Sequence, residues 1–359
     1  MSEQTPQPEL EPPPAPPKRR RKLTRRRKLV FGLFLACTLL LGSEGVLRLL
    51  GYPKGLMRSA KRLWATDTEQ ATGWFRPSVE VRISWPPELA YTVKTNALGL
   101  RGPAPAGGLP LVLCLGDSTT FGSYVADDEA YPFALGERLA SERLGVLNAG
   151  CPHTTLSDQY EVLERSLETL KPRVVVLLFC GNDLYELEKS PAKARALKRR
   201  NPISDLASSL AISDAAISLT LSARHSYLRA KGPWPVPLRP DQGRTAGDSD
   251  ERWERYEREL ARTLKLTRSK GAKLILCAFP GYLEIAEAEP CEIETRLPAM
   301  AARAGVSYVD LYAPFRAAKE QKLYLLPHDA HASAIGNRLV AKTLAKAVLE
   351  AARSKPEGE

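Results

Sequence analysis

The stretch "LVLCLGDSTTFGS", residues 111–123, decides how the fold of this chain is interpreted. Five apolar residues run directly into Gly-Asp-Ser, so we expect a buried strand that ends in a turn carrying Ser118. Gly, Asp and Ser all form turns readily, and a turn alone would explain them. Ser118 becomes a candidate nucleophile only if the rest of the chain brings a base and hydrogen-bond donors to the same place.

Short apolar runs of strand length recur beyond this stretch. They lie at 144–150, 173–183, 272–280 and 306–311. Their lack of alternation is typical of strands that are buried on both faces of a parallel sheet. Apolar residues at helical spacing fall between them, at Leu156, Tyr160, Leu163, Leu167 and Leu170, at Trp253, Tyr256, Leu260 and Leu264, and at Val340, Leu344 and Val348. The alternation of strands and helices predicts a doubly wound α/β domain with a parallel sheet of about five strands.

The carboxyl ends of the predicted strands carry the polar candidates. Ser118 follows the first strand, residues 148–153 follow the second, and Asn182 follows the third. In an open parallel sheet, ligands bind outside the carboxyl ends of the strands. We therefore expect these three segments to meet at one edge of the sheet.

A base for Ser118 must come from one of four histidines: His153, His225, His328 and His331. Two of them lie in "LPHDAHASAIGN", residues 326–337, just before the last predicted helix. An imidazole activates a serine hydroxyl when an acidic group orients it, so His331 with Asp329 is the favoured pair. His328 is interpreted as a surface residue or a neighbour of the site. The histidines and acids show no metal-ligand spacing, and serine chemistry of this kind needs neither a metal nor another cofactor.

These motifs together resemble the SGNH/GDSL hydrolases. "GDS" follows the first strand, "NAG" the second and "GND" the third, and an Asp/His loop precedes the terminal helix. The resemblance covers about residues 94–350. "TNALGLRG" (95–102) and "FGSYVADDEAYP" (121–132) are similar to membrane-anchored bacterial members. It implies a flavodoxin-like three-layer α/β/α sandwich, the SGNH hydrolase fold.

The resemblance also implies a role for each site residue. Ser118 would be the nucleophile, His331 the general base and then acid, and Asp329 the group that holds the imidazole. The oxyanion hole would consist of the Ser118 backbone N–H, the Asn182 side-chain amide and a backbone N–H of the second block, at His153 or Gly150. Asp117 is expected to shape the turn, and Asp183 to brace its loop.

This chain departs from the family pattern at three places. His153 and Cys180 stand where the family usually has glycines, counted from Asn148 and Asn182. Asp329 lies two residues before His331 instead of three, which is similar to some SGNH polysaccharide acetyltransferases.

The basic charge of the chain is concentrated at its N-terminus. The net charge is +11, and residues 1–28 carry +6 of it, with nine Lys or Arg in 18–28. No basic stripe interleaved with aromatic residues follows, so a nucleic acid partner is not expected. An uncharged apolar run at 29–42 follows the basic stretch, which is the layout of a signal sequence or signal anchor. The positive-inside rule places the basic end in the cytoplasm.

The domain organisation follows from these features. We expect a disordered Pro-rich and basic cytoplasmic tail at 1–28, a transmembrane signal anchor at 29–50, a linker with a β-rich extension at 51–110, and the hydrolase domain at 111–352. An irregular insertion at 184–250 interrupts that domain. The six cysteines show no C-x-x-C motif and are interpreted as small, mostly buried residues.

The favoured function is a membrane-anchored, extracytoplasmic serine esterase that acts on a small-molecule or glycan acyl ester. Two alternatives remain at this stage. The same serine chemistry could transfer an acyl group to a cell-surface glycan as an O-acyltransferase, or a degenerate site could serve a non-catalytic binding protein.

Overall fold

The protein is described here from a computed structural model. The described residues are 24–50, 63–64, 72–83, 89–186, 246–286, 289–319, 321–326 and 328–354, with scattered residues between 210 and 227.

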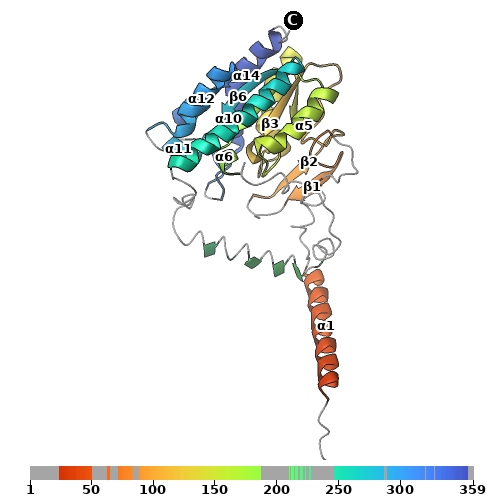
Figure 1. Ribbon diagram of the computed structural model, residues 1–359. Coiled ribbons are helices and arrows are strands. Elements are labelled where there is room, and N and C mark those ends of the chain that lie inside the picture. Colours follow the sequence, from red (N-terminus) through yellow and green to blue (C-terminus); the bar gives the residue numbers. More distant parts are fainter. Residues whose placement is uncertain are drawn as a thin grey trace, which may run out of the picture.

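A five-stranded parallel sheet forms the centre of the molecule (Figure 1). Its strands are β3 (Leu111–Gly116), β4 (Gly145–Asn148), β5 (Val174–Phe179), β6 (Lys273–Ala278) and β7 (Ser307–Val309). The strand order is β4-β3-β5-β6-β7 and every pairing is parallel, which is the flavodoxin-like arrangement. All six residues of the central strand β5 are buried, as expected for a strand covered on both faces. The predicted fold class is confirmed.

Helices cover both faces of this sheet. The helices α4 (Tyr131–Leu139) and α14 (Ala334–Arg353) pack together on one face, and α5 (Leu156–Thr169), α10 (Ala246–Ser269) and α12 (Glu292–Ala304) lie on the other (Figure 1). An ion pair of 2.7 Å between Arg303 and Glu257 links α12 to α10. Short helices follow the strands at their carboxyl ends: α3 (Ser118–Phe121), α6 (Asp183–Glu186), α11 (Tyr282–Ala286) and α13 (Tyr312–Ala317).

The segment before the first sheet strand packs onto the α/β body. The strands β1 (Glu80–Ile83) and β2 (Tyr91–Lys94) form an antiparallel pair in the stretch expected to be a β-rich extension. Phe75 is buried, and its ring lies 5.3 Å from the ring of Phe121 in α3. The extension therefore shares its apolar core with the helix that begins at Ser118.

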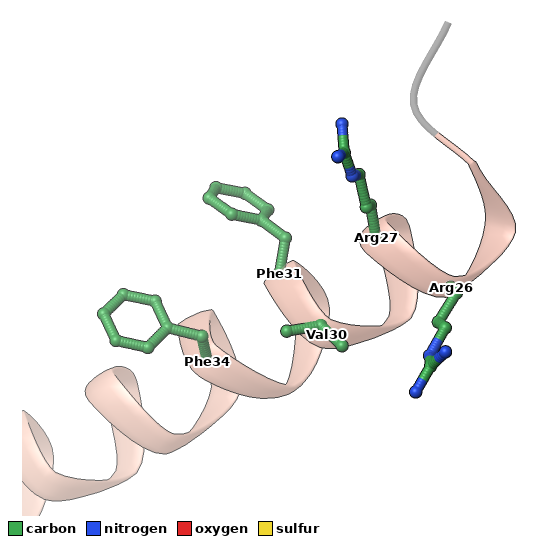
Figure 2. A pocket seen from close by; sticks show the side chains of 5 residues that line it. All are labelled: Arg26, Arg27, Val30, Phe31 and Phe34. Carbon is green, nitrogen blue, oxygen red and sulfur yellow. The ribbon is translucent and has the colours of Figure 1, made fainter.

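The helix α1 (Arg25–Leu49) stands outside the layered body (Figure 1). None of its residues is buried, and an 18-residue window has a mean hydropathy of 1.9, so by length and composition it could cross a membrane. A signal sequence near the N-terminus has the same properties. Figure 2 shows Arg26 and Arg27 in the first turn of this helix, pointing to opposite sides, with the apolar side chains of Val30, Phe31 and Phe34 on the turns that follow. These five side chains surround open space at the surface of one exposed helix, so they do not form a substrate site.

The predicted insertion at 184–250 is described only in part. The helix α6 ends at Glu186, and some residues between 212 and 227 are helical. Residues 187–209 and 228–245 lie outside the described residues, and the second range includes most of a Pro/Gly-rich stretch, "KGPWPVPLRPDQGRTAGDSD" (231–250). The helix α10 begins at Ala246, inside the range expected for the insertion.

Candidate active site

Ser118 is the first residue of α3, directly after the carboxyl end of β3. The Asp117 side chain caps this short helix by accepting the Thr119 N–H at 2.9 Å. Gly116 is needed for the turn, because a Cβ there would lie 2.2 Å from Thr120 Oγ1 and 3.0 Å from the Leu178 carbonyl oxygen. The turn that the sequence predicted is therefore the device that brings the Ser118 hydroxyl to the edge of the sheet.

The loop before α14 brings His331 and Asp329 to Ser118. The distance between His331 Nε2 and Ser118 Oγ is 2.8 Å. On the other side of the ring, Nδ1 is in close contact with Asp329 Oδ1, which also accepts the His331 backbone N–H at 2.8 Å. A hydrogen bond of 3.0 Å from the Leu325 N–H to the His331 carbonyl closes the loop. The structure thus places the three predicted residues in the order acid, imidazole, hydroxyl, which is the arrangement that activates a serine.

The protonation of this pair follows from its surroundings. Burial by itself would lower the His331 pKa, but the hydrogen bond and charge of Asp329, with the charge of Asp117, raise it above its ordinary value. Burial would raise the Asp329 pKa, but its hydrogen bonds and the charge of His331 lower it. Asp329 is therefore ionised at neutral pH and favours a proton on the imidazole. This is what a base needs when it takes the proton of a serine.

Tyr124 covers one side of the imidazole. Its ring meets the His331 ring edge-on, with the centroids 5.4 Å apart. Burial, with the nearby charge of Asp329, raises the Tyr124 pKa, so the phenol stays neutral. The Tyr124 backbone has a φ of 68°, a left-handed conformation that is unusual for a large side chain.

The sequence singled out Asn182 as a hydrogen-bond donor, and the structure places it beside the serine. Its Nδ2 donates to Asp117 Oδ2 at 3.1 Å, while the residue as a whole is exposed. A side-chain amide has two hydrogens, so one is left to point elsewhere. The Asp183 side chain accepts the Cys180 N–H at 3.0 Å, which braces the loop as the sequence suggested.

The two backbone candidates of the second block differ. The Gly150 N–H donates to Asn148 Oδ1 at 3.0 Å, so this N–H already has a hydrogen-bond partner within its own loop. His153 is exposed with a φ of 61°, and among the described residues its N–H has no hydrogen-bond partner. A left-handed backbone explains why glycine suits this position. His153, and not Gly150, is therefore the residue whose N–H is available here.

Asp117 does more than shape the turn. Its Oδ1 lies 3.1 Å from Cys180 Sγ, and its Oδ2 receives the Asn182 amide and lies 3.3 Å from Ser118 Oγ. Burial, with the charges of Asp117 and Asp183, raises the Cys180 pKa, so the thiol stays protonated and can donate to the carboxylate. The Ser118 hydroxyl has one proton, and its contact with His331 is the shorter of the two. Nothing in the local sequence could reveal this cluster, because its members lie on two different strand ends.

Four of the six cysteines are buried, and every one is a free thiol: Cys37, Cys114, Cys151, Cys180, Cys277 and Cys291. Among the described residues, no three His, Cys, Asp or Glu side chains gather as metal ligands would.

Comparisons with known proteins give one family. The model of the GDSL-like lipase/acylhydrolase family matches residues 114–339, more than half of the chain. No curated protein sequence matches. Similar solved structures include an acetyl xylan esterase from Geobacillus stearothermophilus, with 16% identity and a TM-score of 0.41, covering 70% of this chain and 97% of that one. Another is a lipase/acylhydrolase from Enterococcus faecalis, with 16% identity and a TM-score of 0.40, covering 70% of this chain and 100% of that one.

Proposed function

From the premise that the chain belongs to the GDSL-like lipase/acylhydrolase family and is an ester-hydrolysing enzyme, we propose that it works through an acyl-Ser118 intermediate. The observation that carries this proposal is the contact of 2.8 Å between Ser118 Oγ and His331 Nε2, with Asp329 on the opposite ring nitrogen. A hydroxyl is a weak nucleophile until such a base takes its proton.

In the first half of the reaction, His331 Nε2 takes the Ser118 proton while Oγ attacks the ester carbonyl carbon. The imidazolium that forms lies against the ionised Asp329, which stabilises it. His331 then gives the proton to the leaving alcohol, and the acyl group stays on Oγ. In the second half, His331 takes a proton from water while the water oxygen attacks the acyl carbon. The bond between the acyl carbon and Oγ then breaks, the free acid leaves, and His331 returns the proton to Ser118 Oγ.

The negative charge that develops on the carbonyl oxygen needs donors that are already in place. The candidates are the backbone N–H of Ser118 at the start of α3, the second hydrogen of the Asn182 amide and the N–H of His153. Each such donor is worth a factor of about 10²–10³ in rate. Asp117 fixes the first two relative to each other, because it caps α3 and accepts the Asn182 amide.

Hydrolysis of p-nitrophenyl acetate and longer acyl esters tests the proposal. Ser118→Ala and His331→Gln should each abolish turnover, while His328→Gln, in the same loop, should keep it. Activity in purified Ser118→Ala protein would contradict the assigned nucleophile.

Acyl transfer to a sugar hydroxyl is the second candidate, because the Asp-x-His spacing of Asp329 and His331 is shared with some acetyltransferases of this fold. An alcohol would then replace water in the second half of the reaction. Adding a glycan acceptor to the ester assay distinguishes the two, since transfer predicts an acylated glycan that forms faster than free acid.

We also propose that α1 anchors the enzyme in a membrane, with residues 1–28 in the cytoplasm and the domain at 111–352 on the other side. A 25-residue helix is about 37 Å long, enough for the hydrocarbon core, and Arg25, Arg26 and Arg27 mark its cytoplasmic end. Alkaline carbonate extraction of membranes, followed by protease digestion of intact cells or spheroplasts, tests this. The domain should sediment with membranes and be cut only from outside. If the mature protein were instead soluble and its N-terminal residue lay after α1, the helix would be a cleaved signal sequence and not an anchor.

A further inference from the structure

Arg101 is a charged residue that the proposed mechanism does not use, although it is almost fully buried beside the site. It is 2% exposed and comes from the segment between β2 and β3, outside the α/β core. Its Nε donates to Asp127 Oδ1 at 2.7 Å. Burying a guanidinium is costly unless its donors are satisfied, so its other contacts carry information.

The remaining donors of Arg101 hold the chain that follows α3. Nη1 donates to the carbonyls of Phe121 and Gly122 at 2.7 and 2.6 Å, and Nη2 donates to the Val125 carbonyl at 2.7 Å. The guanidinium also lies 4.6 Å from the Phe121 ring centroid. The Arg101 side chain therefore holds both the end of α3, the helix that begins at Ser118, and the loop that follows it.

The loop held in this way carries Tyr124. Its left-handed backbone is unfavourable for a residue with a Cβ, so the neighbouring segments must hold it in place. Arg101 binds the carbonyls of Gly122 and Val125, on either side of Tyr124. Tyr124 in turn packs edge-on against His331. A continuous path of contacts thus joins Arg101 to the imidazole.

We propose that Arg101 is a positioning residue that keeps His331 aimed at Ser118, acting through the 121–125 loop and Tyr124. The inference rests on the proposed function, since it concerns the geometry of the same base. It also makes the segment that carries Arg101 a part of the active site. Lys94, at the end of β2, supports the arrangement, because its N–H donates to Asp127 Oδ2 at 2.9 Å.

Lysine cannot replace Arg101 in this role. An ammonium keeps the charge beside Asp127, but it lacks the planar fork that reaches three carbonyls at once. A base displaced by a fraction of an ångström reacts more slowly without changing how the substrate binds. We therefore expect Arg101→Lys to lower kcat by about tenfold or more and to leave KM within about twofold.

The test compares full-length protein in detergent, with kcat expressed per active site titrated by a fluorophosphonate. The variants are Arg101→Lys, Tyr124→Ala and the double variant. Because both changes act on the same contact, the double variant should be no slower than the slower single variant. Arg268→Lys is the matched control, since Arg268 binds the backbone carbonyls of Ala304 and Gly305 far from the site and should keep its kcat.

A purely structural role for Arg101 predicts a lower melting temperature with an unchanged kcat per titrated site, and this result would overturn the inference. Effects that multiply in the double variant would overturn it as well. If Arg101→Lys does not fold, Asp127→Asn is the substitute test. It weakens the bond between Asp127 and the Arg101 guanidinium, so it should lower kcat by about threefold at constant KM. The proposed function itself would be overturned if the wild-type protein neither hydrolysed esters nor reacted with the fluorophosphonate. This inference alone would be overturned if the wild type were active and the Arg101→Lys variant were equally active.

Discussion

Replacing Asp329 by Asn removes one negative charge and changes almost nothing else in the site. Asp329 Oδ1 contacts His331 Nδ1 and accepts the His331 backbone N–H at 2.8 Å. The Asn oxygen can keep that backbone bond, so it stays beside Nδ1 and the imidazole keeps its orientation. The substitution therefore isolates the contribution of the charge.

The size of the effect follows from the imidazolium that forms during proton transfer. Two unit charges about 4 Å apart interact by about 4 kcal/mol at an effective dielectric constant of about 20. The Asn dipole recovers a part of this. We expect kcat to fall by about 10²–10³, which is less than the ~10⁴ that follows when the wrong imidazole tautomer is selected.

The pH dependence of kcat/KM is an independent test of the charge of Asp329, because it shows in which direction that charge shifts the His331 pKa. The base must be neutral to accept a proton, so kcat/KM falls as the pH drops through the His331 pKa. In the wild type this pKa is raised, which places the acidic limb above about pH 6.5. Asp329→Asn removes the group that raises it, and the limb should move to lower pH.

The same linkage predicts stability. The raised His331 pKa adds to the free energy of unfolding below about pH 6.5, and this contribution is lost as the pH rises through the pKa of the folded state. The lowered Asp329 pKa contributes above about pH 3.9 and is lost as the pH falls through its own folded value. The pair therefore stabilises most between these limits, and Asp329→Asn should lower the melting temperature there.

The assay is steady-state hydrolysis of a p-nitrophenyl ester at several pH values on both sides of neutrality. Active-site titration at each pH gives the concentration of competent enzyme. Asp310→Asn is the matched control, because Asp310 Oδ1 accepts the Tyr312 N–H at 2.8 Å in the same kind of two-residue turn. In the part of the chain that the structure describes, Asp310 has no hydrogen bond to a histidine. Its kcat and pH profile should match the wild type. An Asp329→Asn enzyme within threefold of wild-type kcat, or one whose acidic limb stays in place, would refute the reasoning.

Two further predictions concern packing and thiol reactivity. Gly150→Ala should prevent folding or strongly lower the melting temperature, because its Cβ would lie 2.1 Å from the Phe121 backbone nitrogen. Gly136→Ala is the control: its Cβ would meet Val146 at an ordinary 3.5 Å, so thermal unfolding should show no change or a stabilisation of about 0.5–1 kcal/mol. Equal effects of the two substitutions on the melting temperature would contradict this prediction. Cys180 and Cys277 should resist Ellman's reagent at pH 8 until the protein unfolds, because burial raises the pKa of both thiols, and rapid labelling of either in the native protein would show that the core is open.

The sheet was predictable from the sequence because its strands are buried on both faces. A run such as Val174–Phe179 has no polar residue, and its length and β-branched content separate it from a helix. Two of the covering helices, α4 and α12, were not singled out. The helix α4 has only nine residues and contains Gly136, and Pro298 lies inside α12, so neither presents a long uninterrupted helical pattern.

The central residues of the site were predictable for a different reason. Ser118, Asn182 and His331 each follow or precede a recognisable element, so topology alone brings them to one edge. The supporting contacts were not. Arg101 lies in the stretch expected to be a linker with a β-rich extension, and Tyr124 lies in the loop after Ser118. Both belong to segments that carry the family resemblance, but the resemblance assigned neither residue a role, and both are held against the site by partners distant in sequence. Periodicity and turn chemistry describe local structure, and they do not encode which distant carbonyls a buried arginine will bind.

Covalent labelling tests the central claim most directly. Full-length protein is treated with a fluorophosphonate, digested, and the modified residue is located by mass spectrometry. The account predicts one adduct per molecule, on Ser118, that is lost in Ser118→Ala and formed far more slowly in His331→Gln. Folded protein that remains unlabelled, or an adduct on any other residue, would contradict it.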